Sequence, residues 1–308
     1  MPKAIRLGLD LGGTKIEIVA LDGQGRECLR RRVATPVAGY DATLAAMAGL
    51  VREVELELGL PPNVSPVGVG TPGSISRVTG LLRGSNSVAL NGRPLREDLA
   101  ALLGRDVRIT NDANCFALSE ATDGAGRGAD VVFGVILGTG VGAGVVVHGR
   151  ALDGANAIAG EWGHNPLPWP RDDERPGREC YCGHAGCIET WLSGPGIAAD
   201  HQQVTGSTLA APRIVAGAEA HDPACEATVA RYEERLARSL AHVINIVDPD
   251  VIVLGGGMSN VERLYVNVPR QWGAWVFSDR VDTRLARNVH GDSSGVRGAA
   301  WLWGKLPD

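Results

Sequence analysis

Apolar and polar residues alternate in short runs along the first third of the chain. Residues 5–9 and 15–21 alternate as strands do and flank a short glycine turn, which predicts a β-hairpin. A third strand is expected near Cys28–Val33. Apolar residues then recur at helical spacing over 44–58, so the chain is predicted to open as three strands followed by a helix.

Short apolar strands that end in glycine or polar loops recur later in the chain. Two of them, at 67–70 and 107–109, each lead into a polar loop. Residues 131–147 repeat the hairpin with a glycine turn at its centre. This recurrence predicts an internal duplication, an α/β protein of two related lobes with the hairpin turns facing a cleft between them.

The remaining patterns suggest where the lobes divide. A helix with apolar positions from Tyr232 to Val247 precedes a strand at 251–254, and a last helix is expected at 295–303. The expected lobes are 1–112 and 113–294, with the segment 295–308 joining the first lobe. The length of 308 residues also favours two lobes over one core.

Composition narrows the possible partners. The net charge is −5 and no basic run stands out, so we expect no nucleic-acid partner. No apolar signal core precedes the first strand and no apolar stretch is long enough to span a bilayer, so a cytoplasmic location without membrane contact is expected. Reducing conditions would make disulfides improbable for the six cysteines and favour metal binding or plain burial.

Three glycine loops that follow apolar strands have the composition of a triphosphate site. In the first, two glycines let the backbone approach a phosphate, and Thr14 and Lys15 add a hydroxyl and a cation. This loop is not a Walker A motif, because it leads into a strand, and alone it would more often be a plain hairpin turn. Asp10 is a candidate for Mg²⁺ binding through water, or else a turn cap. The expected ATP and magnesium residues are Gly8, Asp10, Gly12, Gly13, Thr14, Lys15, Gly138, Thr139, Gly140, Gly142, Gly255, Gly256 and Gly257.

The loops resemble those of a known family. Residues 10–15 are similar to the first phosphate motif of the ROK family (repressors, uncharacterised open reading frames and kinases), and residues 138–144 resemble its second. The resemblance covers Gly8 to Trp303 and implies the two-lobed actin-like, hexokinase-like (ribonuclease H-like) ATPase fold. It also implies a homodimer.

Asn111 and Asp112 follow a strand, where side chains can face a ligand. Phosphoryl transfer from ATP to a sugar hydroxyl needs a base, so Asp112 is the candidate general base. The competing interpretation is that one of the two residues only caps the following helix.

A cluster of cysteines predicts a zinc site. His164, Cys180, Cys182 and Cys187 supply the four nitrogen and sulfur ligands of a tetrahedral Zn²⁺ centre, with His184 as a less favoured substitute ligand. Four protein ligands leave no open position, so this zinc is expected to be structural. The pattern, which continues to Glu189, is similar to the zinc signature of the ROK family.

The same resemblance implies which residues contact the sugar. In the family, the residues that match Asn111, Asp112, Glu161, His164 and Glu189 bind it. The loop residues Gly73, Ser74, Asn86 and Asn91 are further candidates, although each also suits a plain turn.

Four segments, at 71–76, 90–92, 161–169 and 290–298, look like the bacterial manno(fructo)kinase branch of the family. They favour D-fructose, with mannose as an additional sugar, as the hexose that ATP phosphorylates at its 6-hydroxyl. N-acetylglucosamine kinase and glucokinase are the alternatives, because nothing physical in the sequence separates these sugars.

Two alternatives from other classes are disfavoured. ROK repressors carry a helix-turn-helix before the phosphate motif, and only nine residues precede Asp10 here. A zinc-held interaction module would leave the glycine loops, Asp10 and Asp112 unexplained.

Overall fold

The computed structural model describes residues 4–85, 87–291 and 294–304, which form two compact units. Unit 1 comprises the described residues of Met1–Gly128, Gly144–Ala159 and Asp292–Asp308, and unit 2 comprises Ala129–Ala143 and Gly160–Gly291. The chain therefore passes between the units several times.

Unit 1 is built on a five-stranded sheet with the order β3-β2-β1-β4-β7. β1 pairs antiparallel with β2, which pairs antiparallel with β3, whereas β1, β4 and β7 run parallel. The strands are β1 (Arg6–Leu11), β2 (Lys15–Leu21), β3 (Glu27–Ala34), β4 (Val67–Thr71) and β7 (Val107–Asn111), and β5 (Ser74–Ile75) and β6 (Leu82–Arg83) form a separate small hairpin.

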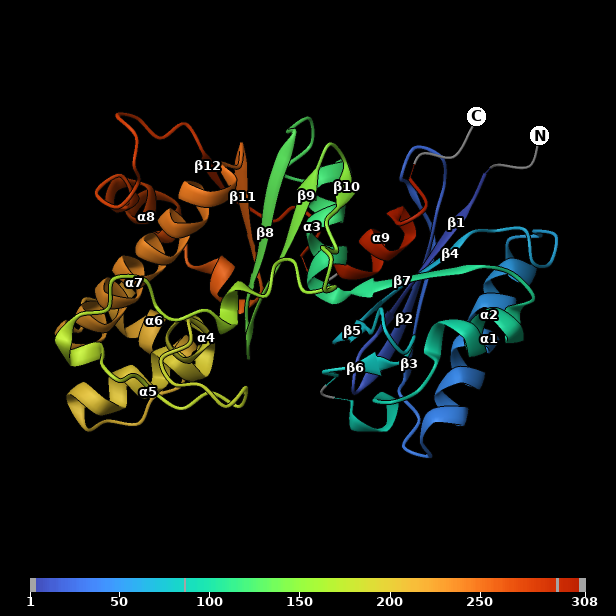
Figure 1. The fold of residues 1–308 in the computed structure, drawn as a ribbon, viewed down its shortest axis with the longest axis horizontal. Coiled ribbons are helices and arrows are strands. Elements are labelled where there is room, and N and C mark those ends of the chain that lie inside the picture. Colours follow the sequence, from blue (N-terminus) through green and yellow to red (C-terminus); the bar gives the residue numbers. More distant parts are fainter. Residues whose placement is uncertain (1–3, 86, 292–293, 305–308) are drawn as a thin grey trace. The chain divides into compact units, whose positions relative to one another are not determined.

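Helices cover both faces of this sheet (Figure 1). On one face lie α1 (Tyr40–Glu57) and α2 (Leu95–Leu103), whose apolar side chains join those of the strands in one core, with the short η1 (Val88–Leu90) nearby. On the other face α9 (Ser294–Trp301) packs against β1 and β4 and against α3 (Asp112–Asp123). The α9 backbone comes so close that a Cβ atom on Gly8 would lie 2.1 Å from the Val296 carbonyl oxygen.

The second sheet has the order β10-β9-β8-β11-β12. β8 pairs parallel with β11, and β11 pairs parallel with β12. The strands are β8 (Val131–Leu137), β9 (Val141–Val147), β10 (Arg150–Ala151), β11 (Val251–Gly255) and β12 (Arg284–Arg287), and β9 begins in unit 2 and continues in unit 1.

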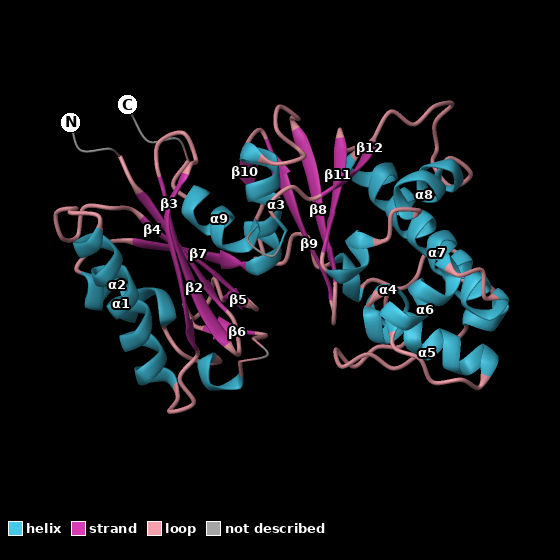
Figure 2. Cartoon of the chain, turned by 180° about the vertical axis from the view of Figure 1, so that it is seen from behind, coloured by secondary structure: helices cyan, strands magenta, loops and turns pink. Residues whose placement is uncertain are grey.

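The helices of unit 2 lie to one side of β8 and β11 (Figure 2). They are α4 (Glu189–Leu192), α5 (Gly194–Thr205), α6 (Ala211–Glu219), α7 (Pro223–Val247) and α8 (Leu264–Trp272), with the short 3-10 turns η2 (Trp162–His164), η3 (Asp172–Glu174) and η4 (Gly257–Asn260). Within this layer Arg238, which is fully buried, bonds both oxygens of the buried Glu174, whose Oε1 also accepts from Arg235.

The predicted strands and the four helices read from the sequence are all present. The compact units, however, divide the chain differently from the expected boundary after Asp112. Helix α3, expected in the second lobe, belongs to unit 1 because it packs along α9, where a Cβ on Gly298 would lie 1.7 Å from the Cys115 carbonyl oxygen. No helix within the described ranges is both long and apolar enough to cross a membrane.

Candidate functional site

The carboxyl ends of three parallel strands bring polar residues to one edge of the unit 1 sheet. β1 ends at Asp10-Leu11, β4 at Thr71 and β7 at Asn111, and the register pairs Asp10 with Gly70 and Thr71 with Asn111. Ligands of open α/β sheets bind at the carboxyl edge of the strands. The structure therefore brings Asp10 and the Asn111-Asp112 pair to the edge where a substrate would bind.

Asn111 is held in place by two hydrogen bonds. Its Oδ1 accepts from the Ala113 amide at 2.8 Å, which makes it the N-cap of α3, and its Nδ2 donates to the Gly73 carbonyl at 3.2 Å. The Oδ1 atom of Asp112 also accepts from the Ala113 amide, at 2.9 Å. The capping interpretation is thus correct for Asn111, and capping places Asp112 on the first turn of a helix that begins at the sheet edge.

Asp10 is a carboxylate in an unfavourable environment for its charge. Burial, together with the nearby charges of Asp112 and Glu17, raises the pKa of Asp10 from 3.8 to about 6, and Lys15 and Arg32 oppose the shift only in part. A nearby cation stabilises the ionised form of such a carboxylate. The shift marks Asp10 as a candidate cation-binding carboxylate at this edge of the sheet.

The first glycine turn is closed by its own backbone. The Gly12 amide donates to the Lys15 carbonyl at 3.0 Å, and Thr35 Oγ1 donates to the Gly12 carbonyl at 2.8 Å. The Lys15 ammonium lies 3.8 Å from Glu17, and its side chain is 43% exposed, so it is accessible to a ligand. Gly8, which the sequence grouped with these residues, lies under α9, and this packing alone requires a glycine there.

Glu17 is a residue of this site that the sequence reasoning missed. Its carboxylate is 1% exposed and accepts hydrogen bonds from Arg30 and Arg32 in addition to its ion pair with Lys15. The available signal was a glutamate between Ile16 and Ile18, in a strand that is apolar from Ile16 onward apart from this residue.

The loops expected to contact the sugar lie partly around a pocket of about 480 Å³ in unit 1. Ser74, Asn111 and Asp153 are among its lining residues. Asn91 is not among them; its amide group bonds the backbone amide and carbonyl of Ser85 at 2.9 and 2.8 Å and so braces that loop. Gly73 has φ +82°, which its turn requires, and Asn86 lies outside the described residues.

In unit 2 the second and third glycine loops lie side by side. Gly256 has φ +78°, and a Cβ atom there would lie 2.5 Å from the carbonyl oxygen of Leu137, the last residue of β8. The β8–β9 turn, which contains Gly138, Thr139 and Gly140 and leads to Gly142, is closed by a 3.0 Å bond from the Gly138 amide to the Gly140 carbonyl. The remaining loop residues, Gly255 and Gly257, end β11 and begin η4.

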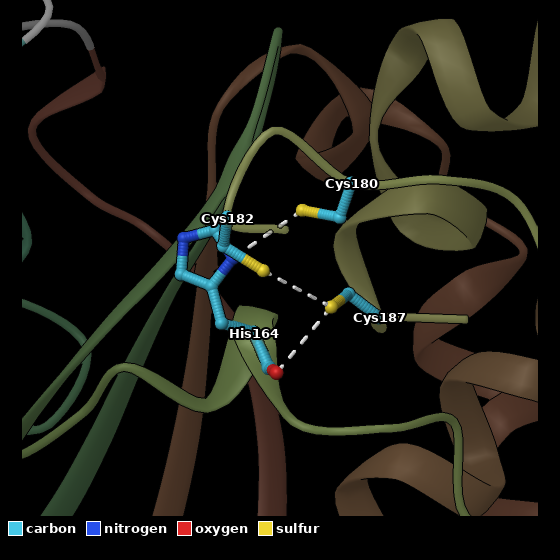
Figure 3. Close-up of side chains that lie close together, drawn as sticks. All are labelled: His164, Cys180, Cys182 and Cys187. Atoms are coloured by element: carbon cyan, nitrogen blue, oxygen red, sulfur yellow. Dashed lines mark hydrogen bonds between the residues drawn. The ribbon is translucent and has the colours of Figure 1, made fainter. Parts of the chain in front are cut away.

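The four expected metal ligands converge in unit 2 (Figure 3). The ligand atoms of His164, Cys180, Cys182 and Cys187 all lie within 4.8 Å of one another. Cys182 Sγ lies 3.6 Å from Cys187 Sγ, and Cys180 Sγ lies 3.6 Å from His164 Nδ1. A tetrahedron with ordinary Zn–S and Zn–N bonds has S···S and S···N edges of about 3.8 and 3.6 Å. The donor set and its spacing therefore fit zinc.

The surroundings of the cluster orient its ligand atoms. Burial, followed by the neighbouring thiols of Cys182 and Cys180, raises the pKa of the Cys187 thiol. The other ring nitrogen of His164, Nε2, lies 3.0 Å from the Tyr181 hydroxyl, which leaves Nδ1 directed at the cysteines. His184 is not in the cluster, although its backbone carbonyl accepts from the Cys180 amide.

Glu161 and Glu189, the two carboxylates expected at the sugar, differ in their surroundings. Glu161 is exposed just before η2. Glu189 is half-buried, and its Oε2 accepts a 2.9 Å hydrogen bond from the Val141 amide, where the β8–β9 turn enters β9. The sequence did not suggest this contact, because 48 positions separate the two residues.

Comparison with known proteins agrees with this architecture. The sequence pattern of the ROK family matches residues 6–305. An N-acetyl-D-glucosamine kinase of Salmonella heidelberg is 42% identical over 299 residues, which are 96% of this chain and 98% of that protein. A second N-acetyl-D-glucosamine kinase, from Citrobacter koseri, is equally similar, with the same identity and coverage.

Solved structures show the same fold. The ROK hexokinase of Thermus thermophilus superposes with a TM-score of 0.85 at 30% identity, covering 97% of both chains. A ROK family glucokinase from Streptomyces griseus, in complex with glucose and AMPPNP, superposes with a TM-score of 0.76 at 26% identity and covers 97% of this chain and 98% of that one. The chain belongs to the ROK family and has its two-lobed actin-like, hexokinase-like fold.

Proposed function

We propose that this chain, a ROK sugar kinase, transfers the γ-phosphoryl group of Mg²⁺-ATP to the 6-hydroxyl of N-acetyl-D-glucosamine. The observation that carries the proposal is full-length similarity, at 42% identity, to proteins named N-acetyl-D-glucosamine kinases. The arrangement of the carboxylates at the unit 1 sheet edge and the HisCys₃ cluster supports the same chemistry.

Asp112 is the general base in this proposal. It would accept the proton of the 6-hydroxyl as that oxygen attacks the γ-phosphorus, and the bond to the β-phosphate oxygen would break to release ADP. Asn111 and the N-terminus of α3 fix the position of the carboxylate. General-base assistance supplies roughly 10²–10⁴-fold, so positioning and charge neutralisation must supply the rest of the rate.

The nucleotide would bind through the three glycine loops. Asp10 would hold the Mg²⁺ that accompanies ATP, through water, and Lys15 would approach a phosphate by leaving its 3.8 Å contact with Glu17. In unit 2 the backbone amides of the β8–β9 turn, with Thr139, would bind phosphate, and Gly255 to Gly257 would lie against the nucleoside.

The sugar would be held by hydrogen bonds from polar side chains. Asn111, Glu161, His164 and Glu189 are the proposed hydrogen-bonding partners of its hydroxyls. His164, Cys180, Cys182 and Cys187 would hold a zinc ion whose role is to keep the ring of His164 and the loop of Glu189 in place. No reaction step requires zinc, because four protein ligands close its coordination.

Fructose is the second candidate substrate. The segments at 71–76, 90–92, 161–169 and 290–298, which look like the manno(fructo)kinase branch, favour it. The two candidates are separated by measuring kcat/KM for N-acetylglucosamine, fructose, mannose and glucose in a coupled ADP-release assay. We expect N-acetylglucosamine to give the highest value. A higher value for fructose would transfer the assignment to that sugar, and no sugar-dependent ADP release from any hexose would refute the kinase proposal.

A further inference from the structure

The β8–β9 turn of unit 2 is anchored by a carboxylate from the metal-binding segment. The Val141 amide donates to Glu189 Oε2 at 2.9 Å, and a bond to an ionised acceptor is stronger than one between neutral groups. Glu189 is the first residue of α4 and follows Cys187, a member of the HisCys₃ cluster, by two positions. A single short segment therefore connects the cluster with the turn.

Two more contacts fix the same turn from the same side. The Gly194 amide, at the start of α5, donates to the Gly138 carbonyl at 2.7 Å. A Cβ atom on Gly163 would lie 2.2 Å from the Val141 carbonyl oxygen, so the residue next to His164 packs directly against β9. The turn is thus held at Gly138 and on both sides of Val141 by the segment 163–194, which contains all four members of the cluster.

The turn also approaches this carboxylate at Gly140. A Cβ atom there would lie 2.6 Å from Glu189 Oε2, so a larger residue would have to displace the end of the Glu189 side chain. The other oxygen, Oε1, lies 3.9 Å from Cys180 Sγ, so the same carboxylate contacts both the turn and the cluster.

We propose that Glu189 is a positioning residue for nucleotide binding, through which the HisCys₃ segment holds the β8–β9 turn in its phosphate-binding conformation. The inference rests on the proposed function, because it takes this turn as a phosphate loop. It adds that the metal-binding segment acts on the nucleotide as well as on the sugar. Filling the cluster with zinc would restrain the segment 164–187 and so restrain Glu189 against Val141.

The test uses the full-length protein and two readouts that need no turnover. One is the rate of hydrogen exchange of the Val141 amide, followed by NMR. The other is the dissociation constant of ADP, measured by calorimetry without sugar so that a role of Glu189 at the sugar does not enter. Glu189→Ala removes the acceptor, Glu189→Gln keeps a neutral one, and Glu179→Ala is the matched control, an exposed glutamate of the same segment.

For Glu189→Ala we expect Val141 to exchange roughly tenfold faster or more and ADP to bind roughly tenfold more weakly, as loss of a charge-assisted hydrogen bond implies. For Glu189→Gln, the Val141 exchange rate and the ADP dissociation constant should lie between those of the wild type and of Glu189→Ala. Glu179→Ala should change neither quantity. Removal of zinc with a chelator should accelerate Val141 exchange in the wild-type protein. A second chelator experiment on Glu189→Ala should add little.

Unchanged Val141 exchange and ADP affinity in both Glu189 variants would overturn the inference, and circular dichroism identifies any variant that does not fold. Glu189→Gln preserves shape and so keeps the test available if Glu189→Ala is unstable. If the wild-type protein does not bind ADP at all, the proposed function fails. Faster Val141 exchange with unchanged ADP affinity would refute the role in nucleotide binding while leaving the kinase assignment intact.

Discussion

Asp10→Asn should make the protein more stable and less able to bind its nucleotide. The carboxyl group of Asp10 is half-buried near Asp112 and Glu17, and its pKa is raised from 3.8 to about 6. Between these two values the folded state binds more protons than the unfolded state, so the free energy of unfolding falls as the pH rises through this window. Above pH 6 the full penalty of holding the charged form remains.

The size of the penalty follows from the shift. A difference of about two pKa units corresponds to about 3 kcal/mol at pH 7.5, and the same two values give about 1.5 kcal/mol at pH 5. Asparagine has nearly the same shape and no charge. The free energy of unfolding of Asp10→Asn should therefore exceed that of the wild type by up to those amounts. This difference should shrink by about half when the pH is lowered from 7.5 to 5.

Urea unfolding curves of the two proteins at both pH values provide the assay, with Mg²⁺ and nucleotide omitted. Asp22→Asn is the control in the same unit. Burial of Asp22 raises its pKa, but hydrogen bonds from Arg26 and the Gln24 amide outweigh burial and lower it overall. Ionised Asp22 therefore stabilises the folded protein above the unfolded pKa, and this stabilisation is lost as the pH falls. This control should be less stable than wild type at pH 7.5. Equal stability of Asp10→Asn and wild type at pH 7.5, or an advantage that grows at pH 5, would refute the reasoning.

Three other predictions concern the base, the metal and the buried ion network. Asp112→Asn should lower kcat by about 10²–10⁴-fold while sugar affinity measured by calorimetry changes little; turnover near that of wild type would exclude the residue as the base. Elemental analysis should find about one zinc per chain, and chelation should lower the melting temperature, whereas folded protein that is stable without zinc would contradict a structural role. Arg238→Met should reduce the free energy of unfolding by about 3 kcal/mol because it removes a partner of the buried Glu174, and thermal unfolding that matches wild type would show that Arg235 alone suffices.

The strands and the site loops could be predicted because they depend on local patterns. Alternation over 15–21 and helical spacing over 44–58 each correspond to an element with nearly the expected limits. The glycine turns and the cysteine cluster could be read in the same way, since their spacing is itself the signal. The 3.6 Å separations in the cluster agree with the ligand set deduced from residue types alone.

The relations that the sequence did not reveal depend on contacts between distant segments. Helix α3 packs along α9, where Ser294 lies 174 positions after Glu120, and this packing decides the unit to which α3 belongs. Gly8 looked like part of a phosphate loop until α9 accounted for it. Glu189 was assigned to the sugar by resemblance, and only coordinates place its carboxylate on Val141. Substrate choice is similarly remote from local pattern, because the motifs favoured fructose whereas full-length relatives are N-acetylglucosamine kinases.

The most direct test of the central claim is to identify the product. Purified protein would be incubated with Mg²⁺-ATP and N-acetylglucosamine, and the products would be analysed by mass spectrometry and by phosphorus–proton correlation NMR. The account predicts one phosphorylated sugar per ADP, with the phosphate on the 6-hydroxyl. ADP without a phosphorylated sugar, or phosphate on a different hydroxyl, would contradict it.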